Sequence, residues 1–276
     1  MNVPFAIYGG KHYYAEPIIA AFPEHRVYVE PFGGAANVLL RKPHSEVEIF
    51  NDLDSEIVNF FRVLVDESAF GRLRRMLDLT PHSRETFERA VEALISDDRV
   101  ERAYRFFVLV RQARGGLGTG KVTKSAFSVS TRKRNDMAEN VSKWLSAVDG
   151  LGDVAARLKT VEIEHLPAVD LIRKYDAPDV LFYADPPYVP ETRSGGRTDT
   201  YRHEMCVEDH AELLDVLCAC KGRVVLSGYP STLYDDRLVG WRKVHLKARS
   251  HLSNSGEPRT EVLWMKPRPM SEEAAA

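Results

Sequence analysis

The chain has 276 residues and a mass of 31.2 kDa, which allows one large domain or one domain with a sizeable insertion. Its 44% hydrophobic and 28% charged residues exclude a disordered or fibrous protein, and its net charge of −2 gives by itself no hint of a polyanionic partner such as DNA. The densest apolar run is residues 106–110, the N-terminus lacks a signal pattern, and there are only three cysteines, so we expect a cytoplasmic protein with reduced thiols and no membrane partner.

The first sixty residues alternate between predicted helices and strands. The predicted elements are a helix over 11–21, a strand over 27–29, a helix over 35–41, a strand over 47–50, and a helix that Asp54 caps. This order predicts a parallel sheet with crossover helices, an α/β fold.

The pattern then becomes helical. Thr80-Pro81 is expected to open a helix that runs through Ile95. Residues 113–135 are rich in Gly, Ser, Thr, Lys and Arg and show little periodicity. We therefore interpret residues 62–154 as a helical insertion with a basic loop.

The α/β alternation returns near residue 161. The predicted elements are strands over 161–163, 180–184, 224–227, 241–246 and 261–265, and helices over 168–175 and 208–218. We accordingly expect one discontinuous α/β domain, residues 1–61 and 155–267, and a disordered tail, residues 268–276.

A glycine turn follows the first strand. Glu30-Pro31-Phe32-Gly33-Gly34 lets the backbone approach a ligand closely, and Asp52 ends the next strand, where a carboxylate can accept hydrogen bonds from ribose hydroxyls. This arrangement is typical of a site that binds a nucleoside cofactor. An ordinary tight turn with Asp52 as a helix cap remains the alternative.

Asp185-Pro186-Pro187-Tyr188 follows an apolar strand and is more specific. Consecutive prolines have a fixed φ and no N–H donor, so they form a stiff stretch with exposed carbonyl acceptors. Asp185 and the Pro186 carbonyl can accept two N–H bonds from a planar amine while Tyr188 stacks on its ring. A nucleobase with an exocyclic amino group has this shape. Ser227 to Pro230 ends the next strand and is expected to line the same mouth.

These motifs resemble those of the Dam-type N6-adenine DNA methyltransferases, a group of amino-methyltransferases with the D-P-P-Y motif. The shared segments, in the family's order, are Gly9-Gly10-Lys11, Glu30 to Gly34, Asn51-Asp52, an insertion, and Asp185 to Tyr188. The resemblance implies a Rossmann-like S-adenosylmethionine-dependent methyltransferase sheet whose insertion is a target-recognition domain.

The resemblance also implies roles for individual residues. Asp185, Pro186, Pro187 and Tyr188 are expected to be catalytic. Lys11 is expected to meet the cofactor carboxylate, Asp52 its ribose, and Phe32 its adenine. The whole expected cofactor set is Ile7, Tyr8, Gly10, Lys11, Glu30, Phe32, Gly33, Gly34, Asp52 and Asp185.

The expected reaction is direct methyl transfer to N6 of an adenine that has left the duplex stack, with no metal. Transfer to N4 of cytosine is an alternative, because D-P-P-Y also suits that amine, and a non-catalytic nucleic-acid-binding relative is another. We expect a monomer, encoded by a bacterium or phage. Whether a restriction endonuclease acts separately on the same site stays open.

Local charge indicates a DNA contact. Residues 102–134 contain nine basic residues and no acidic one, and a second basic stretch follows residue 241. Arg suits guanine edges, and Lys, Ser and Thr suit phosphates. The expected DNA-binding residues are Arg111, Arg114, Lys121, Lys124, Arg132, Lys133, Arg134, Arg249 and Asn254. A solvated basic face is the plain alternative.

The same stretch contains a misleading motif. Residues 115–121 fit the G-x-x-x-x-G-K phosphate loop, but Val122 stands where a magnesium-binding Ser or Thr is required. We therefore do not expect a nucleotide triphosphatase.

Overall fold

The computed structural model describes residues 3–114, 123–193, 201–246 and 261–267. The helices are α1 (Ala15–Ala20), α2 (Ser55–Leu64), α3 (Glu67–Asp78), α4 (Arg84–Glu92), α5 (Arg99–Gln112), α6 (Glu139–Asp149), α7 (Leu151–Leu158), α8 (Ala168–Tyr175), α9 (Val207–Ala219) and α10 (Thr232–Arg237). The strands are β1 (Val27–Glu30), β2 (Val47–Asn51), β3 (Lys133–Arg134), β4 (Met137–Ala138), β5 (Glu162–Glu164), β6 (Val180–Ala184), β7 (Arg223–Gly228), β8 (Arg242–Leu246) and β9 (Glu261–Met265). Within these ranges, every helix is too short or too polar to cross a membrane.

Seven of the described strands form one sheet in the order β5-β2-β1-β6-β7-β9-β8. The strands from β5 to β7 run parallel, whereas β9 pairs antiparallel with both β7 and β8. The order reverses between β1 and β6, and open α/β sheets bind ligands at such a reversal. The predicted α/β fold with a mostly parallel sheet is confirmed.

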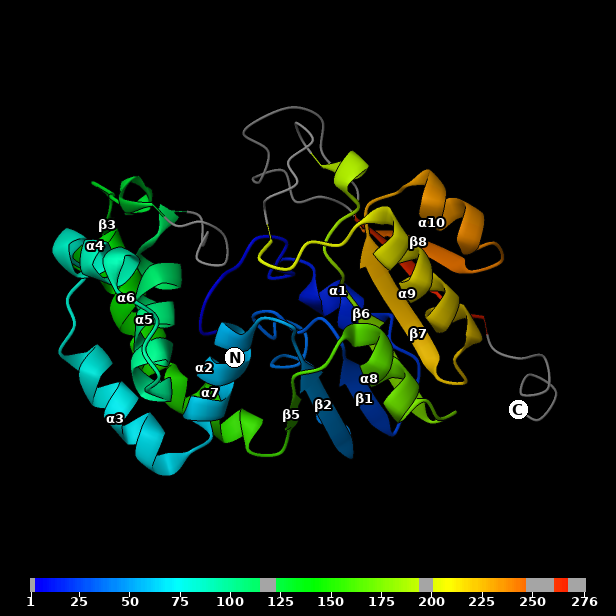
Figure 1. The fold of residues 1–276 in the computed structure, drawn as a ribbon, viewed down its shortest axis with the longest axis horizontal. Coiled ribbons are helices and arrows are strands. Elements are labelled where there is room, and N and C mark those ends of the chain that lie inside the picture. Colours follow the sequence, from blue (N-terminus) through cyan, green and yellow to red (C-terminus); the bar gives the residue numbers. More distant parts are fainter. Residues whose placement is uncertain (1–2, 115–122, 194–200, 247–260, 268–276) are drawn as a thin grey trace.

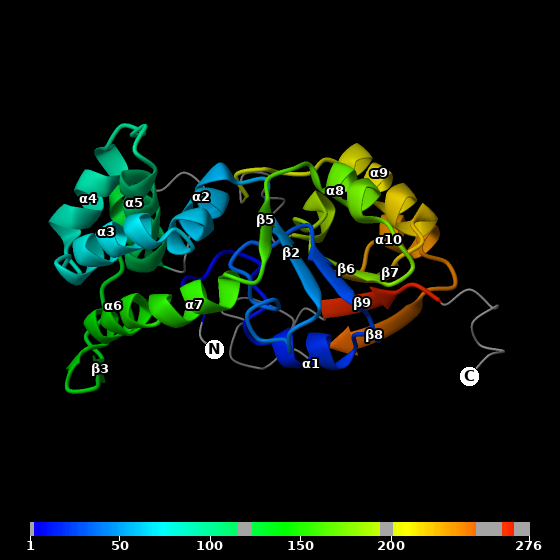
Figure 2. The same cartoon turned by 90° about the horizontal axis from the view of Figure 1, so that it is seen from below.

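Both faces of the sheet are buried. Along β6, Leu181 and Tyr183 enter one hydrophobic cluster, whereas Val180, Phe182 and Ala184 enter another. Helices α8, α9 and α10 cover one face, and α1 and α7 lie on the opposite side (Figures 1 and 2). Burial on two sides explains why the strands read as continuous apolar runs.

The segment between β2 and β5 forms a helical part beside the sheet (Figure 1). Asp66, Ser83 and Asp98 cap its helices α3, α4 and α5 by accepting hydrogen bonds from backbone N–H groups in the first turn. A hairpin joins β3 to β4, and its two loop residues, Asn135 and Asp136, have φ of 51° and 59°, as a type I′ turn requires.

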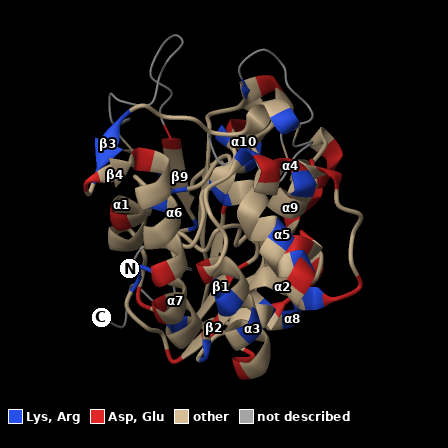
Figure 3. Cartoon of the chain, turned by 90° about the vertical axis from the view of Figure 1, so that its left-hand side faces the viewer, with Lys and Arg blue, Asp and Glu red and all other residues tan. Residues whose placement is uncertain are grey.

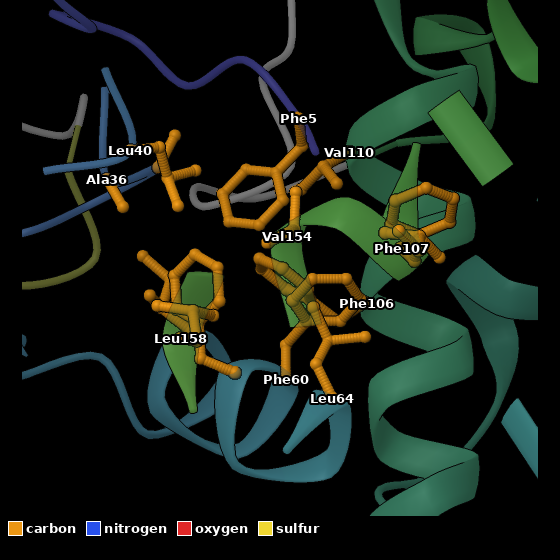
Figure 4. Packing of buried hydrophobic residues seen from close by; sticks show 14 of the residues in the cluster. Phe5, Ala36, Leu40, Phe60, Leu64, Phe106, Phe107, Val110, Val154 and Leu158 are labelled. Atoms are coloured by element: carbon orange, nitrogen blue, oxygen red, sulfur yellow. The ribbon is translucent and has the colours of Figure 1, made fainter. Parts of the chain in front are cut away.

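The sheet and the helical part share one hydrophobic core. Phe5 packs against Phe60 of α2 and Phe106 of α5, with ring centroids 5.5 and 5.1 Å apart, and Phe60 stacks on Phe107 at 5.4 Å (Figure 4). Tyr28 of β1 belongs to the same cluster. This packing is continuous across residues 62 and 154. The expected division of the chain into an insertion over 62–154 and a surrounding α/β domain therefore stays a prediction.

Two expected elements differ from the structure. The helix over 35–41 is wrong: the segment forms a series of turns, because Gly34 and Ala36 have φ of 51° and 55°, in the left-handed region that interrupts a right-handed helix. The helix expected from Thr80 begins at Arg84 and ends at Glu92, so Ile95 lies beyond it and is 74% exposed.

Candidate active site

A cavity of about 450 Å³ opens at the carboxyl ends of β1 and β6, where the strand order reverses. Its lining includes Glu30 at the end of β1, Asp52 after β2, and Asp185 after β6. The sequence motifs that were predicted to carry the chemistry therefore meet around one space. This is the position at which parallel α/β sheets hold ligands.

The glycine loop lies tightly against the neighbouring strand. A Cβ atom on Gly33 would come within 2.1 Å of the Phe50 ring, so no larger residue fits there. Gly34 has a φ of +51°, which favours glycine, and a Cβ atom on it would lie 2.6 Å from Ile7 Cδ1. The backbone itself therefore forms this wall of the cavity.

Asp52 fastens the loop to α2. Its Oδ2 accepts a hydrogen bond from the Gly34 N–H at 2.7 Å, and its Oδ1 accepts one from the Asp54 N–H at 2.8 Å. Asp54, and not Asp52, caps α2, as the sequence predicted. Burial raises the pKa of Asp52 to about 6, although both backbone donors act to lower it.

Glu30 is a second buried acid at this edge. It is 2% exposed, and its Oε2 accepts the Tyr28 hydroxyl at 3.0 Å. Burial raises its pKa to about 8, so its carboxyl group carries a proton at neutral pH.

Asp185 stands at the mouth of the cavity and is held through one oxygen. Its Oδ1 accepts a hydrogen bond from Ser227 Oγ at 2.8 Å and forms an ion pair with Lys11 Nζ at 2.5 Å. Among the described residues Oδ2 has no such partner, and the side chain is 17% exposed. Ser227, near the end of β7, thus touches Asp185, but residues 227–230 are not part of the cavity lining, so their expected place at this mouth stays a prediction.

Lys11 is buried with its ammonium group between two carboxylates. Nζ lies 2.5 Å from Asp185 Oδ1 and 3.4 Å from Glu261 Oε1, and it donates to the Tyr188 hydroxyl at 3.0 Å. Burial alone lowers the pKa of Lys11, but the two carboxylates raise it well above its usual value. The ammonium therefore stays charged although it is only 3% exposed.

Tyr188 is held on several sides. Its hydroxyl donates to Glu261 Oε2 at 3.0 Å, and its backbone carbonyl accepts from Arg193 Nε at 2.7 Å. Its ring stacks on Tyr229, with centroids 4.2 Å apart and planes 18° from parallel. The last residue of D-P-P-Y is thus fixed through its hydroxyl, its ring and its backbone.

Residues 201–204 cover one side of the cavity. The Tyr201 ring packs edge-on against Tyr8 at 5.6 Å, and Arg202 forms an ion pair with Asp54 at 3.0 Å. This segment links the region after D-P-P-Y to the beginning of α2.

The sequence profile of the D12 class N6 adenine-specific DNA methyltransferase family matches residues 8–243. The chain belongs to this family. The resemblance inferred from Gly-Gly-Lys, the glycine turn and D-P-P-Y is therefore confirmed.

Individual relatives of this D12 class chain agree with the family. It is 27% identical, over 91% of its length, to the DNA N-6-adenine-methyltransferase of Escherichia phage P1, and it spans 33% of that longer protein. It is 24% identical, over 92% of its length, to the DNA adenine methylase of Vibrio cholerae serotype O1, of which it spans 91%. A solved structure of an rRNA methylase from Streptococcus thermophilus aligns over 93% of the chain with 11% identity and a TM-score of 0.35, which is too low to bear on function.

The expected cofactor residues of the D12 class chain gather as a set. All of them line the cavity: Ile7, Tyr8, Gly10, Lys11, Glu30, Phe32, Gly33, Gly34, Asp52 and Asp185. Lys11, however, already contacts Asp185, Glu261 and the Tyr188 hydroxyl. Its expected contact with a cofactor carboxylate stays a prediction.

The expected DNA contacts are less uniform. Arg114, Arg132 and Arg134 are exposed, and Lys133 and Arg134 give β3 its basic surface (Figure 3). Lys133 and Lys124 form ion pairs with Asp136 and Glu92. Lys121, Arg249 and Asn254, and also the phosphate-loop motif of 115–121, lie outside the described residues.

Arg111 differs from the other expected DNA contacts. Its Nη2 donates to the Lys143 carbonyl at 2.7 Å, and burial lowers its pKa to about 10. It thereby ties α5 to α6, so a structural role accounts for its position, and its DNA contact stays a prediction.

The sequence analysis missed two residues that hold D-P-P-Y, Glu261 and Arg193, whereas Tyr229 belongs to the segment 227–230 that was expected nearby. Glu261 begins the apolar run of β9, and an acid at the start of a strand that is otherwise buried was the available signal. Arg193 follows D-P-P-Y by only five positions, but nothing in its neighbourhood marks it as buried.

Proposed function

We propose that the chain transfers a methyl group from S-adenosylmethionine to N6 of an adenine in double-stranded DNA. One observation carries this proposal. In a chain that matches the family over residues 8–243, Asp185 of D-P-P-Y stands at the mouth of the cavity that the glycine loop walls. The acceptor for an amine and the place for a cofactor are thus adjacent.

The cavity fits a nucleoside cofactor. Gly33 and Gly34 form a cradle that a Cβ atom would fill. Asn37 Oδ1 and Asp54 Oδ2 belong to residues that line the same cavity, and both atoms are buried without a hydrogen-bond partner in the described part of the chain, so a ligand with hydroxyl or amino donors would satisfy them. S-adenosylmethionine, when bound, supplies an electrophilic methyl group.

The residues that would hold the cofactor follow from this lining. The glycine backbone of residues 33–34 would approach it closely, Asp52 would accept a ribose hydroxyl, and Ile7, Tyr8 and Phe32 would provide apolar contact for its adenine.

Asp185 and Pro186 would orient the target amine. An adenine amine is a poor nucleophile, because its lone pair is delocalised into the ring. Oδ2 of Asp185 and the Pro186 carbonyl would each accept one N–H bond and thereby stabilise the positive charge that grows on nitrogen. Lys11 and Ser227, by occupying Oδ1, would keep the carboxylate in one orientation.

The amine of a paired adenine is buried in the duplex, so the base must leave the stack to reach Asp185. Tyr188 would contact the extruded ring. Because Tyr188 is only 7% exposed here, entry of the base requires side chains around this ring to move.

DNA is therefore the partner that we propose, contacted through the basic residues of the helical part. Because the relatives named above come from a phage and from bacteria, we propose the cytoplasm, where the DNA lies, as the site of action. A monomeric state and a separately acting restriction endonuclease stay predictions.

The test is incubation of plasmid DNA with the purified protein and labelled S-adenosylmethionine, followed by sequencing that detects modified bases. We expect N6-methyladenine within one short sequence. Asp185→Ala is the control: it should remain folded but transfer no methyl group. N4-methylcytosine as the product would replace the adenine assignment, and full methylation by Asp185→Ala would remove the role of Asp185.

A further inference from the structure

We propose that Glu261 is a positioning residue for the methyl-transfer reaction, and that its carboxylate fixes the Tyr188 hydroxyl and the Lys11 ammonium beneath the base-binding side of D-P-P-Y. This inference rests on the proposed function. It assigns to β9, the last described strand, a direct part in arranging a motif that lies after β6.

Glu261 is a buried carboxylate with one hydrogen bond, through Oε2, and one longer ionic contact, through Oε1. It is 1% exposed, its Oε2 accepts the Tyr188 hydroxyl at 3.0 Å, and its Oε1 lies 3.4 Å from Lys11 Nζ. Within the described ranges, Oε1 has no closer hydrogen-bond donor. A carboxylate buried in this way is retained only where its partners compensate the cost of removing it from water.

The charges explain why a second carboxylate matters. Asp185 and Glu261 face a single ammonium, that of Lys11, so the three groups together carry one net negative charge. Without Glu261, the Lys11 ammonium would interact with Asp185 alone and would withdraw more electron density from that carboxylate. Asp185 would then accept an N–H bond from the target amine less strongly. Glu261 therefore shares the cation and leaves Asp185 a better acceptor.

The contact with Tyr188 explains the second effect. A tyrosine ring can rotate and shift unless its hydroxyl is held, and this hydroxyl is held by a donor, Lys11, and an acceptor, Glu261. Ring stacking on Tyr229 fixes the plane only from one side. The hydroxyl clamp thus sets where an extruded base finds its stacking partner.

The experiment is a double-mutant cycle on Glu261 and Tyr188. The substrate is a duplex oligonucleotide that carries the sequence methylated by the wild type. Glu261→Gln keeps the size but removes the charge, Glu261→Ala removes both contacts, and Tyr188→Phe removes only the hydroxyl. We expect each single variant to lower kcat by about 10-fold to 100-fold, the range for loss of one charged hydrogen bond, while the Kd of S-adenosylmethionine changes little. Glu261→Ala combined with Tyr188→Phe should be no slower than Glu261→Ala alone, because the contact that Tyr188→Phe removes is already absent from Glu261→Ala.

Glu48→Gln is the matched control. Glu48 is also buried and pairs with cations, Lys42 at 2.5 Å and Arg157 at 2.6 Å, but it lies outside the cavity lining. It should lower the free energy of unfolding and leave kcat unchanged, which separates a general loss of stability from loss of positioning.

A cofactor-free crystal structure of Glu261→Gln provides a readout other than activity, with the expectation that the stacking of Tyr188 on Tyr229 is displaced. If Glu261→Ala does not fold, Glu261→Gln and Glu261→Asp carry the test. An unchanged kcat in Glu261→Gln, or effects of Glu261→Ala and Tyr188→Phe that multiply independently, would overturn the inference. A wild-type protein that methylates no DNA would instead refute the proposed function.

Discussion

Lys11 Nζ lies 2.5 Å from Asp185 Oδ1, which joins the Gly-Gly-Lys segment to D-P-P-Y in a buried ion pair. The sequence predicted that both segments belong to a cofactor site, but it assigned Lys11 to the cofactor itself. The structure shows that the two motifs contact each other directly. The ion pair makes the position of Asp185 depend on Lys11.

Lys11→Met is expected to destabilise the protein strongly. Among the described residues, it removes the only cation that the structure places against the partly exposed carboxylate of Asp185 and the buried one of Glu261, and breaking a buried pair costs about 3–5 kcal/mol. Urea unfolding measures this loss. Lys174→Met is the control, because its pair with Glu164 is half exposed and should contribute about 1 kcal/mol or less. Equal losses in both variants would contradict a buried pair.

Gly33→Ala should abolish cofactor binding. The added methyl group would lie 2.1 Å from the Phe50 ring, so the loop must move away from its place against β2, at a cost of about 1–3 kcal/mol. Isothermal titration with S-adenosylmethionine and a thermal melt measure the two effects. Gly71→Ala in α3 has no atom within 4 Å of its added carbon and should stabilise the helix by about 0.5–1 kcal/mol. If Gly33→Ala binds S-adenosylmethionine with wild-type affinity, the glycine loop does not form a wall of the cofactor site.

The free energy of unfolding should fall as the pH rises from 6.5 to 8. Glu30 has its pKa raised by burial to about 8, whereas in the unfolded chain it returns to its usual value of 4.5. In this interval the native state binds more protons than the unfolded state, so stability decreases, by at most about 1.4 kcal/mol per pH unit for this group. The decrease ends above the pKa of about 8.

Below pH 6.5, buried His210 has the opposite effect on the free energy of unfolding, so the contribution of Glu30 stands alone only above that pH. The pKa of His210 is lowered by burial to about 4, so this side chain favours the native state as the pH rises toward 6.5 and changes little above that. Glu30→Gln is the control, and it should flatten the profile between pH 6.5 and 8. A profile that keeps its slope in Glu30→Gln would exclude Glu30 as the cause.

Reversing the charge of the β3–β4 hairpin should weaken DNA binding. In the triple variant Arg132→Glu, Lys133→Glu and Arg134→Glu, the logarithm of affinity should depend less on salt, with a slope smaller by about 0.9 for each phosphate that the protein no longer neutralises. Fluorescence anisotropy at several salt concentrations measures the slope. Reversal of Arg173 and Lys174 on α8, which also carry exposed charges, is the control. The same affinity and slope as the wild type would exclude the hairpin from the interface.

Much of the fold follows from local sequence. The bounds of α8, β6 and β9 agree with the predicted segments 168–175, 180–184 and 261–265, because their hydrophobic period and end signals are clear. The error at residues 35–41 has a physical reason: good helix formers stand there, but the contacts of the glycine loop force Gly34 and Ala36 into left-handed conformations.

The D-P-P-Y site was predictable only in part. Asp52 and Asp185 follow strands β2 and β6, which flank β1, and parallel strands of one sheet bring their carboxyl ends to the same edge, so their meeting could be predicted. Glu261 could not be placed, because its approach to Tyr188 depends on β9 entering the sheet antiparallel between β7 and β8. Such a strand order is a property of the whole sheet and leaves no mark near residue 261.

The aromatic contacts of Phe5 with Phe60 and Phe106 have a consequence for how a target sequence is selected. They join the helical part and the sheet through one hydrophobic core. Under the proposed function, the distance from the hairpin that would face the DNA to the mouth at Asp185 is then set by this packing. A duplex must conform to that distance, so the spacing between the base pairs that are read and the adenine that is modified is set by the same packing, and adjustment falls to the bending and unstacking of the DNA.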